Sequence, residues 1–258
     1  MKVEVFAPAK INLTLEVGAK REDNYHNLTS VMARIDFCDR LILEACENAS
    51  VRFFSNAPSL PQDNLCVKTA RRYLDLKGIS KGVNITLESK IPFASGMGAG
   101  SADAAAVIEG METLFGALEP DTRHTLARSI GADVPYCLEK TPCLCTGIGD
   151  ECQKIECGDL SSLFIVVVKE GEKLSTAQVY EDFDKMMVHR HDCDHISVVR
   201  AIEVGDVKAL AKGVFNTFED VVFKSSPHLA KTKSTLLEKV LPLIMLTALI
   251  AVFIKTII

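Results

Sequence analysis

The feature that most constrains this fold is a glycine-rich segment joining a short apolar stretch to an alanine-rich run. Residues 91–111 read IPFASGMGAGSADAAAVIEGM, with glycine at positions 96, 98 and 100. Glycine tolerates positive φ and lets other groups approach the main chain. Free N–H groups and aligned peptide dipoles at the start of a helix favour bound anions. The segment therefore predicts a phosphate-cradling loop before a helix, with Ser101 as the N-cap or as a hydroxyl that contacts phosphate.

Two common phosphate-binding motifs do not describe this segment. A P-loop ends in Gly-Lys-Ser/Thr, whereas Gly100 is followed by Ser101 and Ala102. A dinucleotide-binding fingerprint spaces its glycines differently and lies in the first βα unit of its fold. Two interpretations remain, a phosphate loop of a third kind and a plain junction between a strand and a helix.

Composition narrows the class of ligand. The chain has 258 residues, of which 48% are hydrophobic and 24% charged, so it can bury a sizeable core as one domain or as two small lobes. Its net charge of −5 argues against nucleic acid as a partner, because binding to the phosphate backbone usually requires a basic face. We therefore expect a small-molecule ligand.

The cysteines and the first residues of the chain indicate in which cellular compartment the protein is expected. Nine cysteines are an odd number, and they show no spacing typical of a disulfide framework or a zinc site. The first residues, MKVEVFAPAKINLTLEV, do not show the charged and then apolar pattern of a signal peptide. We expect a cytoplasmic protein, with no nucleic acid and no membrane among its partners.

The pattern of apolar residues predicts a mixture of strands and helices. Alternation and apolar runs predict strands over 2–17, 40–54 and 83–89, a buried strand over 164–169, and a hairpin over 141–156. Helical spacing predicts helices over 64–77, from 101 onward, and over 121–130, 176–187 and 198–214. The fold class is therefore α+β.

Two further clusters contain residues suited to catalysis. Lys10 and Asn12 lie two positions apart on a predicted strand and so share a face, although a lone lysine on a strand is often simply solvated. Asp133 lies among apolar neighbours between Gly131 and Pro135. A buried carboxylate without a partner is costly. We therefore expect Lys10 and Asp133 to pair.

Eight motifs, taken in order, resemble the GHMP kinases. They are PAKINLTLEV, NYHNLTSVM, NLCVKTA, IPFASGMGAGSADAAA, GADVPYCL, TGIGDE, STAQVY and NTFEDVVF, and they cover about residues 2–224. The resemblance implies a two-lobed GHMP kinase fold. Residues 1–155 would form an N-terminal lobe like domain 2 of ribosomal protein S5, and 156–258 an α/β C-terminal lobe that is atypical from about residue 231.

The resemblance also implies a reaction, and we expect a monomer or homodimer that carries it out. ATP with Mg²⁺ would phosphorylate the 2-hydroxyl of a methylerythritol that carries a cytidine diphosphate group, a step of non-mevalonate isoprenoid biosynthesis. Asp133 would be the general base and Lys10 the cation that supports it and the transferring phosphoryl group.

The remaining site residues are also assigned by resemblance. Asn12 would orient the substrate, Tyr25 would stack on the cytosine, and His26 would hydrogen-bond its polar edge. Asn64 would lie near the adenine or would serve only as an N-cap, and Ser101 is a candidate Mg²⁺ ligand. The ATP loop would consist of Pro92, Ala94, Ser95, Gly96, Met97, Gly98, Ala99, Gly100 and Ser101.

The sequence departs from the family pattern in three places, one of which is the segment EKTPC at 139–143, which lacks the usual glycine pair. Asn24 stands where the family has glycine, and asparagine is among the residues that best tolerate positive φ, so we expect the turn to survive. No glycine follows Gly213, so the third glycine-rich motif of the family is missing. The uncharged run from Val240 to Ile254 could be a divergent core strand and helix, a tail replaced by a frameshift or truncation, or a membrane anchor.

These departures leave two alternative functions open. The chain could be another GHMP kinase that acts on a different alcohol, such as mevalonate or homoserine. It could also be a nucleotide-binding protein whose catalysis is impaired by the loss of the third motif.

Overall fold

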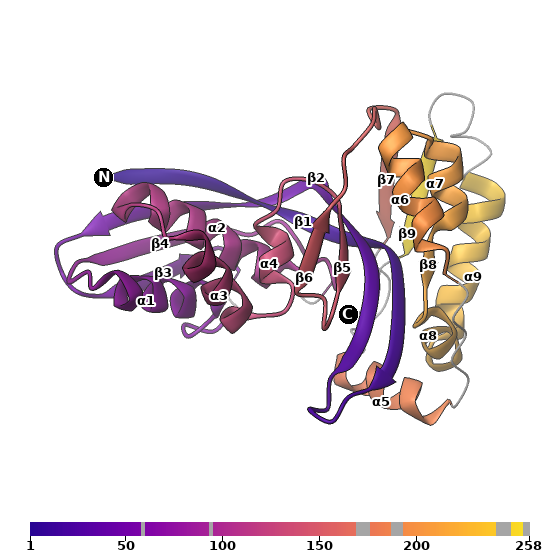
Figure 1. The fold of residues 1–258 in the computed structure, drawn as a ribbon, viewed down its shortest axis with the longest axis horizontal. Coiled ribbons are helices and arrows are strands. Elements are labelled where there is room, and N and C mark those ends of the chain that lie inside the picture. The colour runs from indigo at the N-terminus through magenta and orange to yellow at the C-terminus, as the bar shows by residue number, and fades with distance from the viewer. Residues whose placement is uncertain (58–59, 93–94, 169–175, 187–192, 241–248, 255–258) are drawn as a thin grey trace. The chain divides into compact units, whose positions relative to one another are not determined.

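The computed structural model describes residues 1–57, 60–92, 95–168, 176–186, 193–240 and 249–254 (Figure 1). The chain forms two compact units. The first comprises residues 1–10, 34–93 and 98–140, and the second comprises residues 11–33, 94–97 and 141–258. Two long strands, β1 (Lys2–Lys20) and β2 (His26–Cys46), contribute residues to both units.

The seven-stranded sheet of the described residues includes strands from the predicted segments, and it also includes residues 26–39 and 215–216, which the sequence did not predict as strands. β2 pairs antiparallel with β4 (Gly82–Glu88), and β3 (Val51–Ser55) pairs in parallel with β4. The hydrogen-bonded order of the sheet is β3-β4-β2-β1-β8, in which β8 comprises Phe215–Asn216, with β5 (Cys143–Thr146) on β2 and β6 (Glu151–Lys154) on β5. The predicted strand over 40–54 is wrong as a single element, because β2 ends at Cys46 and a bend over the sequence ENAS at 47–50 separates it from β3.

Capping residues set both ends of the first helix of the first unit. α1 (Leu65–Lys77) starts at Asn64, whose side chain accepts a hydrogen bond from the Val67 N–H, and ends at Gly78 in the left-handed region. α2 (Ala99–Phe115) follows the glycine-rich segment, and it is followed by α3 (Pro120–Ile130) and α4 (Val134–Cys137).

The alanine-rich sequence of α2 allows this helix to approach the sheet closely. A Cβ atom added at Gly110 would lie 2.9 Å from both Cδ atoms of Leu43 on β2. Small side chains therefore let α2 lie against the strand. The buried residues include Ala102, Ala104, Ala105, Ala106, Val107, Ile108 and Met111.

The hairpin of the second unit is confirmed. β5 (Cys143–Thr146) and β6 (Glu151–Lys154) pair antiparallel around Gly147 and Gly149, both of which have positive φ. β5 also pairs with residues 30–32 of β2, and the short strand β8 (Phe215–Asn216) pairs in parallel with β1.

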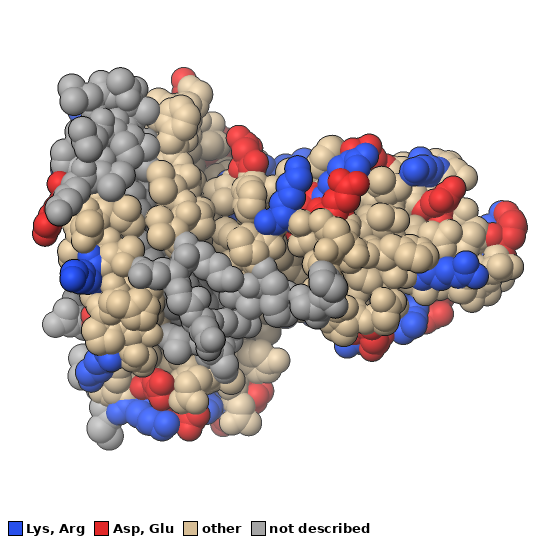
Figure 2. All heavy atoms as spheres, turned by 180° about the vertical axis from the view of Figure 1, so that it is seen from behind, with Lys and Arg blue, Asp and Glu red and all other residues tan. Residues whose placement is uncertain are grey.

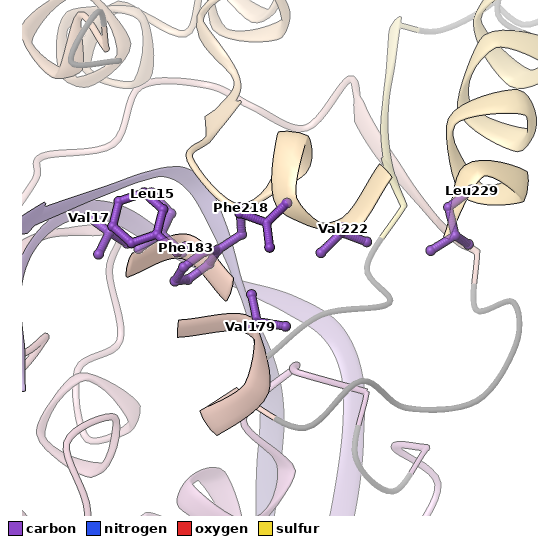
Figure 3. Close-up of a cluster of buried hydrophobic side chains, with 8 residues drawn as sticks. Leu15, Val17, Val179, Phe183, Phe218, Val222 and Leu229 are labelled. Carbon is purple, nitrogen blue, oxygen red and sulfur yellow. The ribbon is translucent and has the colours of Figure 1, made fainter. Parts of the chain in front are cut away.

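A cluster of buried apolar side chains holds α5 (Thr176–Lys185) in the second unit (Figure 3). α5 packs with β1 and with α8 (Glu219–Ser225) and α9 (Pro227–Thr235). The cluster consists of Leu15, Val17, Val179, Phe183, Phe218, Val221, Val222 and Leu229. This packing fixes the position of the polar residues on the other side of α5.

The second unit also contains two helices and a π-helical turn. α6 (His195–Val204) and α7 (Val207–Gly213) are separated by Gly205 in the left-handed region, and η1 (Leu236–Val240) follows α9. The sequence predicts one or two helices over 198–214, and the structure has two.

The apolar tail contributes a strand. β9 (Leu249–Ile254) pairs in parallel with β7 (Leu163–Val168), in register from Leu163 with Leu249 to Val168 with Ile254. The prediction that β7 would be fully buried is wrong. Phe164 is 55% exposed, because among the described residues this sheet has only two strands. Within the described ranges no helix is long and apolar enough to cross a membrane.

Charged side chains of both signs are interspersed on the face shown in Figure 2. Among the described residues, Arg40 contacts Glu4 at 2.6 Å and Glu88 at 2.7 Å. Such exposed pairs contribute little to stability, but they spread charge of both signs over the surface.

Candidate active site

The ion pair expected from the sequence is present in the first unit. Lys10 Nζ lies 3.0 Å from Asp133 Oδ2. The Lys10 side chain is 6% exposed and that of Asp133 is 33% exposed, so the cation is buried while the acid reaches solvent. This arrangement compensates the buried charge and leaves the carboxylate accessible to a ligand.

Local structure directs the Asp133 side chain toward Lys10. Asp133 is the N-cap residue of α4, but its carboxylate makes no capping hydrogen bond to that helix. All four residues of α4 are buried, and Arg34 Nη2 donates a hydrogen bond to the Cys137 carbonyl at 2.9 Å. The short helix is therefore held by packing and by Arg34, which leaves the Asp133 carboxylate available for Lys10.

Gly98 lies directly beside Lys10. Its φ is +68°, and a Cβ atom at this position would lie 2.8 Å from Lys10 Cγ and 3.3 Å from Lys10 Cε. Glycine is required here for two reasons, the left-handed backbone and the close approach of the lysine stem.

The first turn of α2 differs from one of the sequence predictions. The N-cap residue is Gly98, and Ser101 is the third helical residue, so the prediction of Ser101 as N-cap is wrong. No side chain caps this helix. The first N–H groups of an α-helix have no partner within the helix, so those at the start of α2 remain available to an anion. A Cβ atom at Gly131 would lie 4.0 Å from Ser101 Oγ, so the hydroxyl is close to the segment that leads to Asp133.

Other residues of the predicted ATP loop differ in burial. Pro92 is half-buried, whereas Ser95 and Met97 are buried, and Gly96 has a φ of +68°. Ser95 Oγ is buried and has no hydrogen-bond partner within the described part of the chain. Ala94 lies outside the described residues. Ala99 and Gly100 belong to the first turn of α2.

Asn64 has the N-cap role that was one of its two predicted roles. Its Oδ1 accepts from the Val67 N–H at 3.2 Å, and its Nδ2 donates to the Pro61 carbonyl at 2.9 Å. The adenine contact stays a prediction.

In the second unit, residues 21–25 form the expected turn. Asn24 has a φ of +68°, as the substitution for glycine predicted, and the Arg21 N–H donates to the Tyr25 carbonyl at 2.7 Å. Tyr25 is 58% exposed, so its ring is accessible to a base. Asn12 lies on β1 and is half-buried.

His26 is buried in the second unit, and sequence reasoning missed its neighbours. His26 Nε2 lies 2.8 Å from Asp184 Oδ1, and the His26 and Tyr180 ring centroids are 4.9 Å apart. Lys20 Nζ contacts the other Asp184 oxygen at 3.2 Å. Burial opposes ionisation of Asp184, but hydrogen bonds from His26 and Lys20 hold its pKa below the usual value. No local signal could identify Asp184, because 158 residues separate it from His26.

The described residues contain no group of three or more His, Cys, Asp or Glu side chains that could hold a metal ion. Protein side chains alone therefore do not build a metal site within the described ranges. Mg²⁺ commonly binds through substrate phosphates together with one or two protein ligands, so this finding is compatible with a metal that arrives with its nucleotide.

Comparisons with known proteins identify a family. A family model described as the GHMP kinases N terminal domain matches residues 64–140. A 4-diphosphocytidyl-2-C-methyl-D-erythritol kinase from Thermoanaerobacter pseudethanolicus is 34% identical over 241 residues, which are 92% of this chain and 81% of the relative. An enzyme of the same name from Bacillus mycoides is 36% identical over 237 residues, 91% of this chain and 81% of the relative.

Solved structures share the fold. A crystal structure of 4-(cytidine 5'-diphospho)-2C-methyl-D-erythritol kinase superposes with a TM-score of 0.73 at 28% identity, covering 91% of this chain and 82% of that one. A homoserine kinase from Cytophaga hutchinsonii superposes with a TM-score of 0.54 at 18% identity, covering 83% of this chain and 71% of that one, and this likeness concerns the fold alone. The predicted α+β GHMP kinase fold is confirmed.

Proposed function

Because this chain belongs to the family of 4-diphosphocytidyl-2-C-methyl-D-erythritol kinases, we propose that it phosphorylates the 2-hydroxyl of 4-diphosphocytidyl-2-C-methyl-D-erythritol with ATP. This is a step of non-mevalonate isoprenoid precursor biosynthesis. The observation that carries the proposal is the Lys10–Asp133 pair at 3.0 Å beside Gly98, at the start of α2.

Asp133 acts as the general base in this proposal. Its carboxylate is one-third exposed and can accept the proton of a hydroxyl placed within hydrogen-bond distance. Lys10 compensates the negative charge of the acid and that of the phosphoryl group in transfer. Phosphoryl transfer depends mostly on positioning and electrostatic stabilisation, so a base, a cation and a phosphate-binding loop form a sufficient set.

The residues at the start of α2 could bind the phosphates of a nucleoside triphosphate. The uncapped first turn offers N–H groups, and Gly96 and Gly98 have the positive φ of a loop whose main chain turns toward a ligand. The buried Ser95 hydroxyl lacks a protein partner and could donate to a phosphate. ATP supplies the transferred phosphoryl group. Ser101 is the proposed protein ligand of the accompanying Mg²⁺, which neutralises phosphate charge.

Tyr25 and His26 are the residues proposed to bind the cytidine end of the substrate. Tyr25 offers an exposed ring for stacking on the cytosine, and His26 would hydrogen-bond its polar edge. Asp184 and Tyr180 hold the His26 ring in place. Asn12 on β1 would orient the methylerythritol.

This substrate is better supported than the alcohols of other GHMP kinases. Relatives that are 34–36% identical carry this one name, whereas the homoserine kinase is 18% identical and shares only the fold. We further propose lobes of residues 1–155 and 156–258, a monomer or homodimer, and a cytoplasmic location.

A coupled ADP-release assay with magnesium, ATP and the cytidyl alcohol tests the proposal. Wild-type turnover should fall by a factor of about 100 or more in Asp133→Asn, the scale expected for loss of a general base. Asp121→Asn, which changes an exposed acid on α3, is the matched control and should leave turnover unchanged. Turnover with mevalonate or homoserine but not with the cytidyl alcohol would reject the proposed substrate, and an Asp133→Asn variant as active as wild type would reject the base.

A further inference from the structure

Two cysteines of the hairpin in the second unit face each other across its strands. β5 and β6 lie side by side (Figure 1), and their register places Cys145 directly opposite Cys152. The two Sγ atoms lie 3.5 Å apart, and the Cys145 thiol donates a weak hydrogen bond to Cys152 Sγ. Seven positions separate the two residues in the sequence, so the turn of the hairpin brings their thiols into contact.

The backbone of the hairpin suits a covalent bridge between these thiols. Residues directly opposite each other in an antiparallel pair have Cα atoms about 4.5 to 5.5 Å apart. A disulfide joins residues whose Cα atoms are about 4.4 to 6.8 Å apart. On the neighbouring pair of residues, Thr146 Oγ1 donates to Glu151 Oε2 at 3.1 Å. The Leu28 N–H donates to the Gly147 carbonyl at 2.9 Å, so contacts on both sides of the turn keep this register.

The two thiols differ in exposure, and this difference sets the order in which they react. Cys145 is 0% exposed, and β5 has a neighbouring strand on each side, β2 and β6. Cys152 is half-buried on β6, which among the described strands pairs only with β5. A small reagent can therefore reach Cys152, whereas Cys145 reacts through its neighbour.

We propose that Cys145 and Cys152 are a site of reversible disulfide formation, with a low-molecular-weight disulfide of the glutathione class, RSSR, as the oxidant. The Cys152 thiol loses its proton, and its sulfur attacks one sulfur of RSSR, which forms a mixed disulfide and releases one RSH. The Cys145 thiol then loses its proton and attacks Cys152 Sγ, which forms the bridge and releases the second RSH. The two protons and two electrons given up by the cysteines pass to the two RSH molecules.

The contact between the thiols favours the bridge over a lasting mixed disulfide. A separation of 3.5 Å is close to that of reacting atoms held ready for reaction, so the second step needs little movement. The bridge would link the outer strand β6 covalently to β5, which pairs with β2. Disulfides in the cytoplasm are usually transient and not structural, so a reversible bridge fits the expected location.

The test exposes the reduced full chain to glutathione disulfide in mildly alkaline buffer and then unfolds it with iodoacetamide present to block the remaining thiols. Cleavage after Glu151 by a glutamate-specific protease separates the two cysteines, so the bridge would hold two peptides together. We expect at least about ten bridged molecules for each one that keeps glutathione on Cys152. Dithiothreitol should separate the linked peptides completely.

Cys152→Ser and Cys38→Ser are the matched variants. Cys38 is half-buried like Cys152, and it makes no hydrogen bond to another thiol within the described part of the chain. Cys38→Ser should therefore form the bridge as wild type does, and Cys38 of wild type should take up glutathione without forming a bridge. In Cys152→Ser, Cys145 should stay unmodified because it is buried. Glutathione on Cys145 of that variant would overturn the order of reaction.

Two results for native wild type would overturn the proposal. One is a protein in which Cys38 takes up glutathione while Cys145 and Cys152 are both recovered with iodoacetamide. The other is a protein that keeps glutathione on Cys152 with Cys145 reduced, because the neighbouring thiol would then fail to resolve the mixed disulfide. If Cys152→Ser does not fold, the wild-type peptides alone decide. The readout is independent of the proposed kinase activity, since it comes from the peptides and not from turnover.

Discussion

Replacing Gly98 by alanine tests whether this position exists to accommodate Lys10. A left-handed backbone at a residue with a side chain costs roughly 1 kcal/mol. The added Cβ would also lie 2.8 Å from Lys10 Cγ, where ordinary contact begins near 3.4 Å, so the lysine stem must move by several tenths of an ångström. Lys10 is buried and paired with Asp133, so this movement displaces the ammonium from the carboxylate.

The movement of Lys10 predicts a loss of turnover. The left-handed backbone and the steric overlap predict a loss of stability. A misplacement of about 1 Å in a catalytic group can cost about 100-fold in rate, so a shift of roughly half that size predicts a fall in kcat of about tenfold. Stability should fall by about 2 to 4 kcal/mol, the sum of a backbone cost of roughly 1 kcal/mol and an overpacking cost of about 1 to 3 kcal/mol. Turnover is measured by ADP release with saturating ATP and alcohol, and stability by urea unfolding.

Gly78→Ala is the matched control for the stability cost of placing a side chain on a left-handed backbone. Gly78 also has a left-handed φ, of +61°, but a Cβ there would meet nothing within 4 Å. This variant should lose about 1 kcal/mol of stability and no turnover. If Gly98→Ala is destabilised no more than Gly78→Ala and keeps its kcat within twofold, the reasoning about Lys10 is wrong.

Three further predictions concern stability. Gly110→Ala should destabilise the protein by about 1 to 3 kcal/mol in urea unfolding, because the new Cβ would lie 2.9 Å from both Leu43 Cδ atoms, and Leu43→Val should relieve part of that loss. Asn64→Ala should lower stability by about 1 kcal/mol through loss of the cap, whereas Asn64→Asp should not, and equal losses in both would contradict the capping role. Burial raises the pKa of Asp39 and raises that of Asp103 well above its usual value. A raised folded-state pKa favours folding below the unfolded pKa, near 4, and this contribution is lost as pH rises toward the folded value. The advantage of Asp103→Asn over wild type in thermal unfolding should therefore grow from pH 5 toward pH 9, and a constant difference would show that Asp103 does not titrate in this way.

Sequence reasoning succeeded where neighbours along the chain decide the structure. The start of α1 at Asn64, the left-handed turn at Asn24 and the hairpin at Gly147 and Gly149 follow from side-chain capping and from φ, which are local properties. The Lys10–Asp133 pair was also predictable, because an acid within an apolar segment favours a compensating cation, although the structure buries Lys10 and leaves Asp133 one-third exposed.

Only the tertiary structure decided which residues far apart in the sequence contact each other. Nothing near Gly98 in the sequence shows that the stem of Lys10 passes beside it, and nothing near His26 identifies Asp184. About fifty residues separate Asp39 from Lys90 and Ile91, yet folding buries Asp39 so that its Oδ1 accepts hydrogen bonds from both main-chain N–H groups. The physical reason is that caps and turns depend on backbone groups a few residues away, whereas burial and charge pairing depend on which surfaces the whole chain brings together.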